Sequence, residues 1–188
     1  MDANHPLPVL QNSACTPNDS NHIVNNVLNY VNKCTSKVSI IVFPECGSGY
    51  HEWNVLIALI RTGYNINTAI FMDSHIEPHS VDEWLRLSQV HHVATKVVDS
   101  YVALEHWTKE QTSPNKVFVI YINGGLKFGE SYCAKHGSSA CLTAAAQFWK
   151  WCDQNAANQL TINFIGRDMR HPADCKSWTE LANTFTKL

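Results

Sequence analysis

Runs of uncharged, β-branched and aromatic residues alternate along this chain with longer segments in which apolar residues recur every three or four positions. The runs are typical of strands buried on both faces of a sheet, and the longer segments predict helices. Strands that alternate with helices favour a parallel sheet, because each crossover places a helix over one face. We therefore expect an α/β fold: a three-layer sandwich with a mainly parallel five-stranded sheet and helices on both faces. The predicted strands cover residues 38–44, 67–72, 93–98, 116–122 and 160–165.

Local signals predict where helices begin and end. Ser80-Val81-Asp82-Glu83 has the Ser-x-x-Glu pattern of a capping box, so a helix should begin at Ser80. Residues 1–19 are polar and interrupted by prolines, which predicts a flexible N-terminal arm before a single domain over residues 20–188. Further helices are predicted over residues 20–33, 51–61, 101–111, 140–154 and 172–186.

The composition narrows the classes of protein and partner. With 188 residues, 45% of them hydrophobic, and a net charge of −2, the chain fits one globular domain with its own core. The chain lacks the excess of basic residues that would indicate a nucleic-acid partner, and no apolar run is long enough to cross a bilayer. We therefore expect neither a nucleic-acid nor a membrane partner. The N-terminal residues lack the apolar core of a signal peptide, which predicts an intracellular, cytoplasmic protein.

Cysteine usage indicates reduced thiols rather than a disulfide framework. The chain has seven cysteines, an odd number, and no Cys-x-x-Cys pair. Cys133-x-x-His136, followed by Cys141 and Cys152, offers four possible zinc ligands, but their spacing fits no compact zinc knuckle. We expect no metal, and we expect most of the thiols to be small core residues.

Polar residues with ligand-binding potential stand where the predicted strands end. Glu45-Cys46-Gly47-Ser48-Gly49 follows the first strand, and its two glycines allow a turn whose backbone N–H groups face the sheet edge. Asp73 ends the second strand, Asp99 the third, and Asn123 follows the fourth. In a parallel sheet, ligands bind beyond the carboxyl ends of the strands. Asp73 also lies 24 residues past Gly49, close to the spacing of a carboxylate that accepts both hydroxyls of a ribose.

These residues resemble a class I S-adenosylmethionine-dependent methyltransferase, with a Rossmann-like fold. Residues 45–49 resemble the acid-x-Gly-x-Gly motif of that family. Asp73 falls at the position of its ribose-binding acid, and Asp99 resembles the acid near the adenine amine. The resemblance covers roughly residues 20–166. It implies S-adenosylmethionine as cofactor, held by Glu45, Gly47, Gly49, Asp73, Asp99 and Asn123.

The same resemblance implies transfer of a methyl group to an acceptor that the sequence does not identify. The acceptor would lie against residues 123–136, where Glu130 and His136 are the nearby groups able to take a proton. The family's Asn-Pro-Pro-Tyr signature is absent, and after Ile165 there is room for one helix but not for a sixth and seventh strand. The resemblance is therefore to a truncated or degenerate version of the fold.

Other interpretations remain open at this level. The glycines are also compatible with a simple turn, and Asp73 or Asp99 with a cap for the next element. A dinucleotide site is less well supported, because Glu52 stands where a third glycine is needed and would repel a pyrophosphate. The alternative to an enzyme is a non-catalytic Rossmann-like binding or accessory protein, such as a viral one, that acts through protein interaction.

Overall fold

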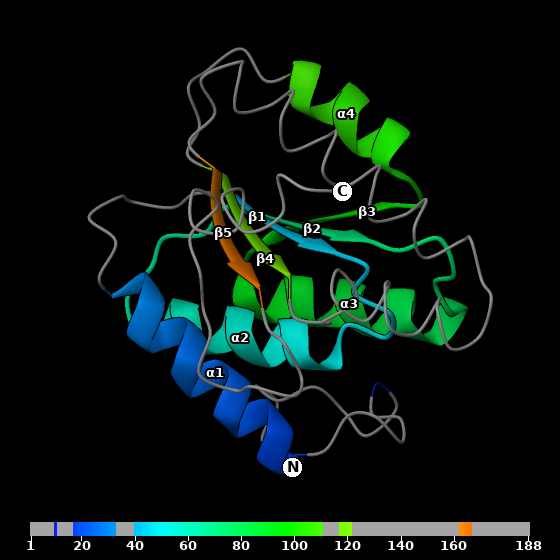
Figure 1. Cartoon of the computed structure of the whole chain (residues 1–188). Coiled ribbons are helices and arrows are strands. Elements are labelled where there is room, and N and C mark those ends of the chain that lie inside the picture. Colours follow the sequence, from blue (N-terminus) through cyan, green and yellow to red (C-terminus); the bar gives the residue numbers. More distant parts are fainter. Residues whose placement is uncertain (1–9, 11–16, 33–39, 111–116, 122–161, 167–188) are drawn as a thin grey trace, which may run out of the picture.

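The computed structural model describes residues 10, 17–32, 40–110, 117–121 and 162–166. Within them, helices and parallel strands alternate along the chain (Figure 1). The helices are α1 (Pro17–Val31), α2 (Tyr50–Arg61), α3 (Pro78–His91) and α4 (Tyr101–Glu110). The strands are β1 (Ile40–Pro44), β2 (Thr68–Met72), β3 (Ala94–Val98), β4 (Val117–Tyr121) and β5 (Ile162–Gly166).

The strands lie in the order β3-β2-β1-β4-β5, and each neighbouring pair is parallel. Strands β2 and β3 are added in turn on one side of β1, and β4 and β5 are then added on its other side. Strand order therefore reverses beside β1, and this is where open parallel sheets bind their ligands. The predicted α/β class and the parallel pairing of β1 with β2 and of β2 with β3 are confirmed.

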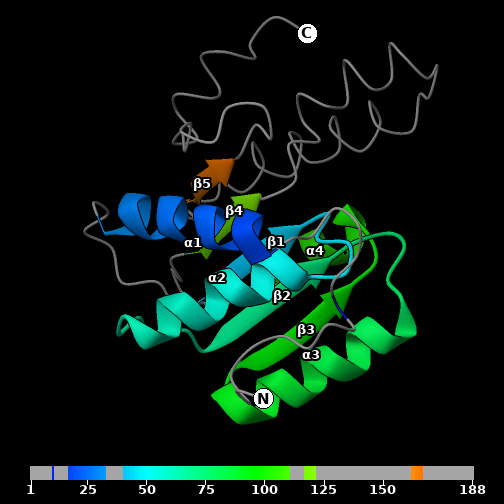
Figure 2. The same ribbon diagram turned by 90° about the horizontal axis from the view of Figure 1, so that it is seen from below.

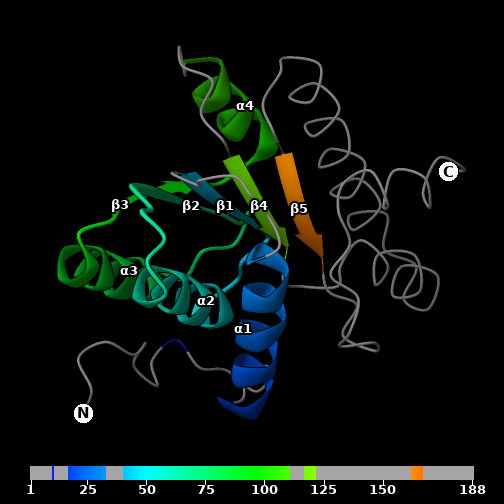
Figure 3. The same cartoon turned by 90° about the vertical axis from the view of Figure 1, so that its left-hand side faces the viewer.

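Helices α1, α2 and α3 lie side by side on one face of the sheet (Figure 2). Helix α4 lies on the opposite side, as Figures 1 and 3 both show. Right-handed crossovers place α2 and α3, which connect β1 to β2 and β2 to β3, over one face, and α4, where the chain changes direction, over the other. The complete three-layer sandwich stays a prediction, since the predicted helices at 140–154 and 172–186 lie outside the described residues.

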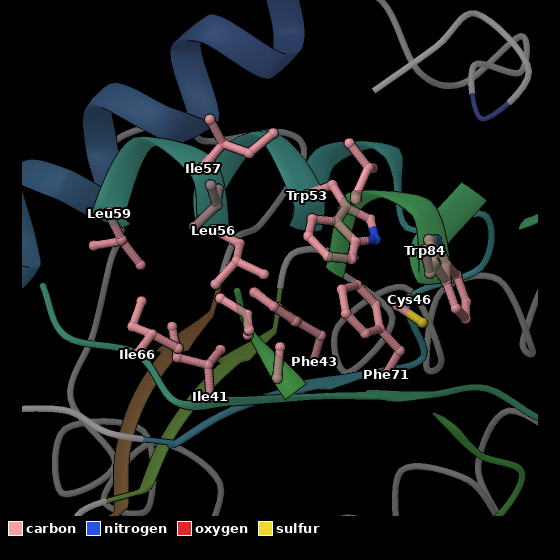
Figure 4. Packing of buried hydrophobic residues seen from close by; sticks show 14 of the residues in the cluster. Ile41, Phe43, Cys46, Trp53, Leu56, Ile57, Leu59, Ile66, Phe71 and Trp84 are labelled. Carbon is pink, nitrogen blue, oxygen red and sulfur yellow. The ribbon is translucent and has the colours of Figure 1, made fainter. Parts of the chain in front are cut away.

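Helix α2 covers the sheet because most of its side chains are buried and most of the buried ones are apolar or aromatic. Trp53 and Leu56 point toward the aromatic and aliphatic residues of β1 and β2, whereas Ile57 lies on the far side of the helix (Figure 4). Phe71 of β2 lies at the centre, with its ring 5.2 Å from Phe43, 5.2 Å from Trp53 and 4.7 Å from Trp84. Burying a large side chain of this kind contributes roughly 1.5–3 kcal/mol. The aromatic cluster therefore fixes α2 and α3 against the carboxyl half of β2.

Strand β3 forms one edge of the described sheet and is less buried than β1. Its exposed residues alternate with half-buried ones, as expected where one face of a strand meets water. Lys96 is one of the exposed residues, and its Nζ lies 5.8 Å from the centre of the Trp107 ring of α4. The polar residues Thr95 and Lys96 within this strand are therefore consistent with its edge position.

Two helices begin earlier than predicted, each at a proline. Helix α1 begins at Pro17 rather than at residue 20, and α3 at Pro78 rather than at Ser80. Proline suits the first helical position, because it lacks an N–H and its φ angle is already helical. Leu10, inside the predicted flexible arm, is fully buried in the hydrophobic core.

The predicted capping box at Ser80 is wrong. Glu77 is the N-cap of α3, and the Ser80 hydroxyl has no hydrogen-bond partner among the described residues. Glu83 instead accepts two hydrogen bonds from the guanidinium of Arg86, at 2.7 and 2.8 Å. The Ser-x-x-Glu spacing therefore occurs within the helix and not at its start.

Candidate functional site

Three of the predicted site acids follow directly from strands that are in register. Pro44 pairs with Met72, and Met72 pairs with Val98. Glu45, Asp73 and Asp99 are the next residues of these three strands. Neighbouring strands are about 4.8 Å apart, so the three acids begin within about 10 Å along one edge of the sheet. The sheet thus brings their backbones together, as the sequence predicts.

The glycine segment after β1 forms a tight turn. The N–H of Gly49 donates to the carbonyl of Cys46 at 2.8 Å, and Gly47 has a φ of +55° at the first central position of this turn. A positive φ there is typical of type II′ turns and favours glycine. Glu45, which precedes the turn, also has a positive φ, of +52°. A non-glycine residue in that region stores backbone strain, and such residues concentrate at functional sites.

Asp73 contacts the glycine turn directly. Its Oδ2 accepts a hydrogen bond of 2.7 Å from the N–H of Gly47, and its Oδ1 accepts one of 2.9 Å from the N–H of His75. Asp73 and Gly47 are thereby joined across 26 positions of sequence. A carboxylate offers about four acceptor sites, so these two bonds leave it able to accept from a ligand hydroxyl as well. Its predicted ribose-binding role stays a prediction.

Glu45 is held by a residue that the sequence analysis did not single out. The hydroxyl of Tyr101 donates to Oε1 of Glu45 at 2.9 Å. Tyr101 is the first residue of α4, which follows β3, whereas Glu45 follows β1. Since β2 lies between those strands, this hydrogen bond crosses the carboxyl end of β2.

Asp99 is less closely connected to the turn. Its side chain is exposed, and its Oδ1 accepts from the hydroxyl of Ser100 at 3.0 Å. The Ser100 hydroxyl in turn accepts from the N–H of Ala103 at 3.3 Å, so Ser100 provides the cap of α4. Asp99 therefore supports the start of α4 through its chain neighbour, and its expected role near an adenine amine stays a prediction.

A buried acid lies behind the turn. Glu52, in the first turn of α2, is 3% exposed. Burial, and to a smaller extent the nearby Asp73 carboxylate, raises the pKa of Glu52 to about 8, although the backbone N–H of Glu52 opposes the shift. Burial, together with the charges of Glu52 and Asp73, also raises the pKa of the Cys46 thiol. Cys46 is thus a buried, unreactive thiol, as predicted for most of the cysteines.

The electrostatics of the turn disfavour a phosphate. The N–H of Gly47, which is the kind of group that cradles phosphates, already donates to a carboxylate. Glu45 precedes the turn and Asp73 contacts it, whereas Glu52, with a pKa of about 8, adds little charge at neutral pH. An anionic ligand here would meet carboxylate charge at close range, whereas a neutral or cationic ligand would not.

The remaining predicted residues lie outside the described part of the chain. They include Asn123 of the cofactor set, the acceptor-side candidates Glu130 and His136, and the possible zinc ligands Cys133, Cys141 and Cys152. Among the described residues, no three His, Cys, Asp or Glu side chains are grouped so that they could hold a metal ion.

Two residues of the site were missed by sequence reasoning. Tyr101 was predicted only as the start of a helix, and Trp84 only as part of the helix expected to begin at Ser80. Trp84 donates from Nε1 to the carbonyl of Ser48 at 3.0 Å, across 36 positions of sequence. Only the strand order, which brings the ends of β1, β2 and β3 together, could have pointed to such contacts.

Comparison with known proteins does not assign this chain to a family. The chain matches no family model, no curated protein and no solved structure. The methyltransferase resemblance therefore rests on the residues quoted for it. In the described part of the chain, every helix falls short of the length and hydrophobicity that a bilayer crossing needs.

Proposed function

We propose that this protein binds S-adenosylmethionine, or a closely related adenosine compound, at the carboxyl edge of β1, β2 and β3. The observation that carries the proposal is the 2.7 Å hydrogen bond between the N–H of Gly47 and Oδ2 of Asp73. It joins the turn expected beside the methionine end of the cofactor to the acid expected beside its ribose. The position, next to the strand where sheet order reverses, is the usual one for nucleoside ligands in parallel α/β sheets.

The charge of the turn supports this ligand class over nucleotides. S-adenosylmethionine carries a sulfonium, an ammonium and a carboxylate group, hence a net positive charge, and no phosphate. Asp73 and Glu45 are acceptors suited to hydroxyl and ammonium donors. A pyrophosphate would instead need backbone N–H donors, one of which already donates to Asp73.

Methyl transfer is the activity that such binding would serve. The acceptor's electron pair would form the new bond to the methyl carbon while the carbon–sulfur bond breaks. The electrons of the broken bond would return to sulfur, which leaves S-adenosylhomocysteine. This displacement depends mainly on alignment and on exclusion of water. The acceptor itself stays unidentified.

The first experiment measures binding of S-adenosylhomocysteine by thermal unfolding and calorimetry. A ligand present at one hundred times its dissociation constant should stabilise the fold by about 2.7 kcal/mol. ATP at the same concentration should stabilise it less, because its phosphates meet the acids of the turn. Absence of both a shift and a heat signal at millimolar S-adenosylhomocysteine would reject the proposal, and stronger stabilisation by ATP would contradict the charge argument.

The substitution Asp73→Asn tests the hydrogen bond between Asp73 and Gly47 on which the proposal rests. The amide keeps one acceptor oxygen, which can still accept from the N–H of Gly47, but it gives up the bond from the N–H of His75 and the charge that strengthens a bond to a ribose hydroxyl. We expect affinity for S-adenosylhomocysteine to fall at least tenfold, which corresponds to about 1.4 kcal/mol. The matched control is Asp82→Asn, an exposed acid on α3, which should leave affinity unchanged. Equal affinities for the two variants would remove Asp73 from the site.

A second candidate function is non-catalytic binding of a protein partner. One observation favours it: Glu45, Asp73 and Asp99 each have a hydrogen-bond donor within the chain, so the edge holds together without a ligand. Under this alternative, neither adenosine compound shifts the melting temperature. A shift without methyl transfer to any acceptor would instead indicate a protein that binds the cofactor and does not turn it over.

A further inference from the structure

The indole of Trp84 is built into the glycine turn. Its Nε1–H donates to the carbonyl of Ser48 at 3.0 Å, and the side chain is fully buried. A Cβ placed on Gly49 would lie 2.6 to 2.9 Å from three atoms of this indole, closer than real Cβ atoms approach a neighbour. The lack of a side chain at Gly49 is therefore what lets α3 reach the turn.

Two hydrogen bonds fix one peptide plane of the turn from opposite sides. The carbonyl of Ser48 accepts from Trp84, and the N–H of Gly49, in the same peptide group, donates to the carbonyl of Cys46 at 2.8 Å. Rotating this peptide would break both bonds. The N–H of Gly47, earlier in the same turn, is held by Asp73. The direction of the turn is thus set by side chains from α3 and from the end of β2.

Trp84 itself has little freedom to move. Its ring stacks on Phe71 at 4.7 Å with 22° between the planes, and the same cluster contains Trp53 of α2, 5.2 Å from Phe71 (Figure 4). Close packing of this kind leaves no alternative rotamer without displacing a neighbour. Helix α3 can therefore impose a fixed position on the turn through one rigid ring.

We infer that Trp84 is a positioning residue for the ligand of this turn: its N–H holds the Ser48–Gly49 peptide in the orientation that binds an adenosine compound. The inference rests on the proposed function. Trp84 acts through the backbone of the turn and need not touch the ligand. Loss of its N–H should therefore weaken binding even where the ring, and with it the hydrophobic core, is largely kept.

The experiment compares Trp84→Phe with Trp53→Phe. Both tryptophans are fully buried and stack on Phe71, but the Nε1–H of Trp53 has no hydrogen-bond partner among the described residues. Both variants should lower the melting temperature, Trp84→Phe the more because it also loses the hydrogen bond to Ser48. Only Trp84→Phe should weaken binding of S-adenosylhomocysteine, by at least tenfold in calorimetry. Equal affinity in the two variants would overturn the inference.

A second measurement uses the wild-type protein, so it does not depend on whether a variant folds. In the ¹⁵N-labelled wild-type protein, the indole N–H resonance of Trp84 should shift on titration with S-adenosylhomocysteine, while that of Trp53 stays in place. Binding without a shift at Trp84 would also overturn the inference. Failure of the proposed function can be told apart from failure of this inference. If the proposed function is wrong, the wild-type protein shows neither binding heat nor a resonance shift with S-adenosylhomocysteine.

Discussion

At the residue scale, the two glycines of the turn have different physical reasons to be glycine. Gly47 needs a positive φ, but a methyl group added to it would meet no atom within 4 Å, whereas Gly49 combines a positive φ of +71° with the Trp84 indole. Alanine in the left-handed region costs about 1–2 kcal/mol, and overpacking a rigid core adds about 1–3 kcal/mol. Gly49→Ala should thus destabilise the protein about twice as much as Gly47→Ala.

Urea unfolding of the two variants measures this difference. Gly63→Ala is the control, because Gly63 has a φ of +93°, open space around it, and a place at the far end of α2. Its cost should match that of Gly47→Ala, since both reflect backbone conformation alone. If Gly49→Ala were no worse than the other two, the close approach of Trp84 would be wrong.

Sequence reasoning could select these glycines but could not tell them apart. A strand followed by Gly-x-Gly and an apolar helix is a local pattern, and it correctly predicts the turn. The reason for Gly49 lies 35 positions further on in Trp84, and no local pattern contains it. The same holds for Glu45, whose partner Tyr101 was visible only as one more aromatic residue in a helix.

At the element scale, helix α4 is tied to the turn by one side chain. The Tyr101 hydroxyl donates to the Glu45 carboxylate at 2.9 Å, with Tyr101 7% exposed. The bond is partly buried, and a hydrogen bond to a charged group contributes about 1.5–3 kcal/mol. Tyr101→Phe should therefore lower the free energy of unfolding by about that amount, and amide hydrogen exchange should accelerate in α4 more than in α2.

Tyr64→Phe provides the matched control for this link. Its hydroxyl also donates to a side chain, that of Asn32, but over 3.3 Å and in an exposed position. Exposed bonds of this length contribute little, so the change should be below about 0.5 kcal/mol. Similar effects of the two substitutions, or uniform hydrogen exchange in α2 and α4, would show that Tyr101 does not anchor its helix.

Elements were predicted well where one signal dominates and poorly where two compete. β1 is wholly apolar and α2 is dense in apolar residues, and the structure has both. At the start of α3, Pro78 and the Ser-x-x-Glu pattern at Ser80 each mark a possible first turn. The proline prevails because its φ is already helical, and Ser80 then lies inside the helix, where its hydroxyl is buried.

At the scale of the whole molecule, a parallel sheet gathers strand-end acids that are distant in sequence. The alternation of strands and helices was enough to predict that Glu45, Asp73 and Asp99 share an edge, because parallel strands end on the same side. It was not enough to predict how their side chains are used, since hydrogen-bond partners come from other elements. The burial of Glu52 behind the turn is a further consequence of packing that composition does not reveal.

That burial couples the stability of the entire fold to pH. The pKa of Glu52 is about 8 in the folded protein, against about 4.3 in an unfolded chain, so between these values the folded state binds one proton more. Stability must then fall as pH rises, by up to about 1.4 kcal/mol per pH unit, and level off above pH 8. The Asp73 carboxylate contributes to this shift, and Glu52 in turn contributes to the raised pKa of the Cys46 thiol.

Glu52→Gln separates this effect from all other titrations, because the amide has the same shape and no charge. At pH 5 the variant and the wild-type protein should have similar free energies of unfolding, and by pH 8 the variant should be more stable by about 3–5 kcal/mol. Glu77→Gln, at an exposed carboxyl, should change stability by less than about 0.5 kcal/mol at either pH. A constant difference between Glu52→Gln and wild type from pH 5 to pH 8 would mean that Glu52 ionises in the folded protein as it does in water. The acid would then be solvated, and the dry interior behind the glycine turn would not exist.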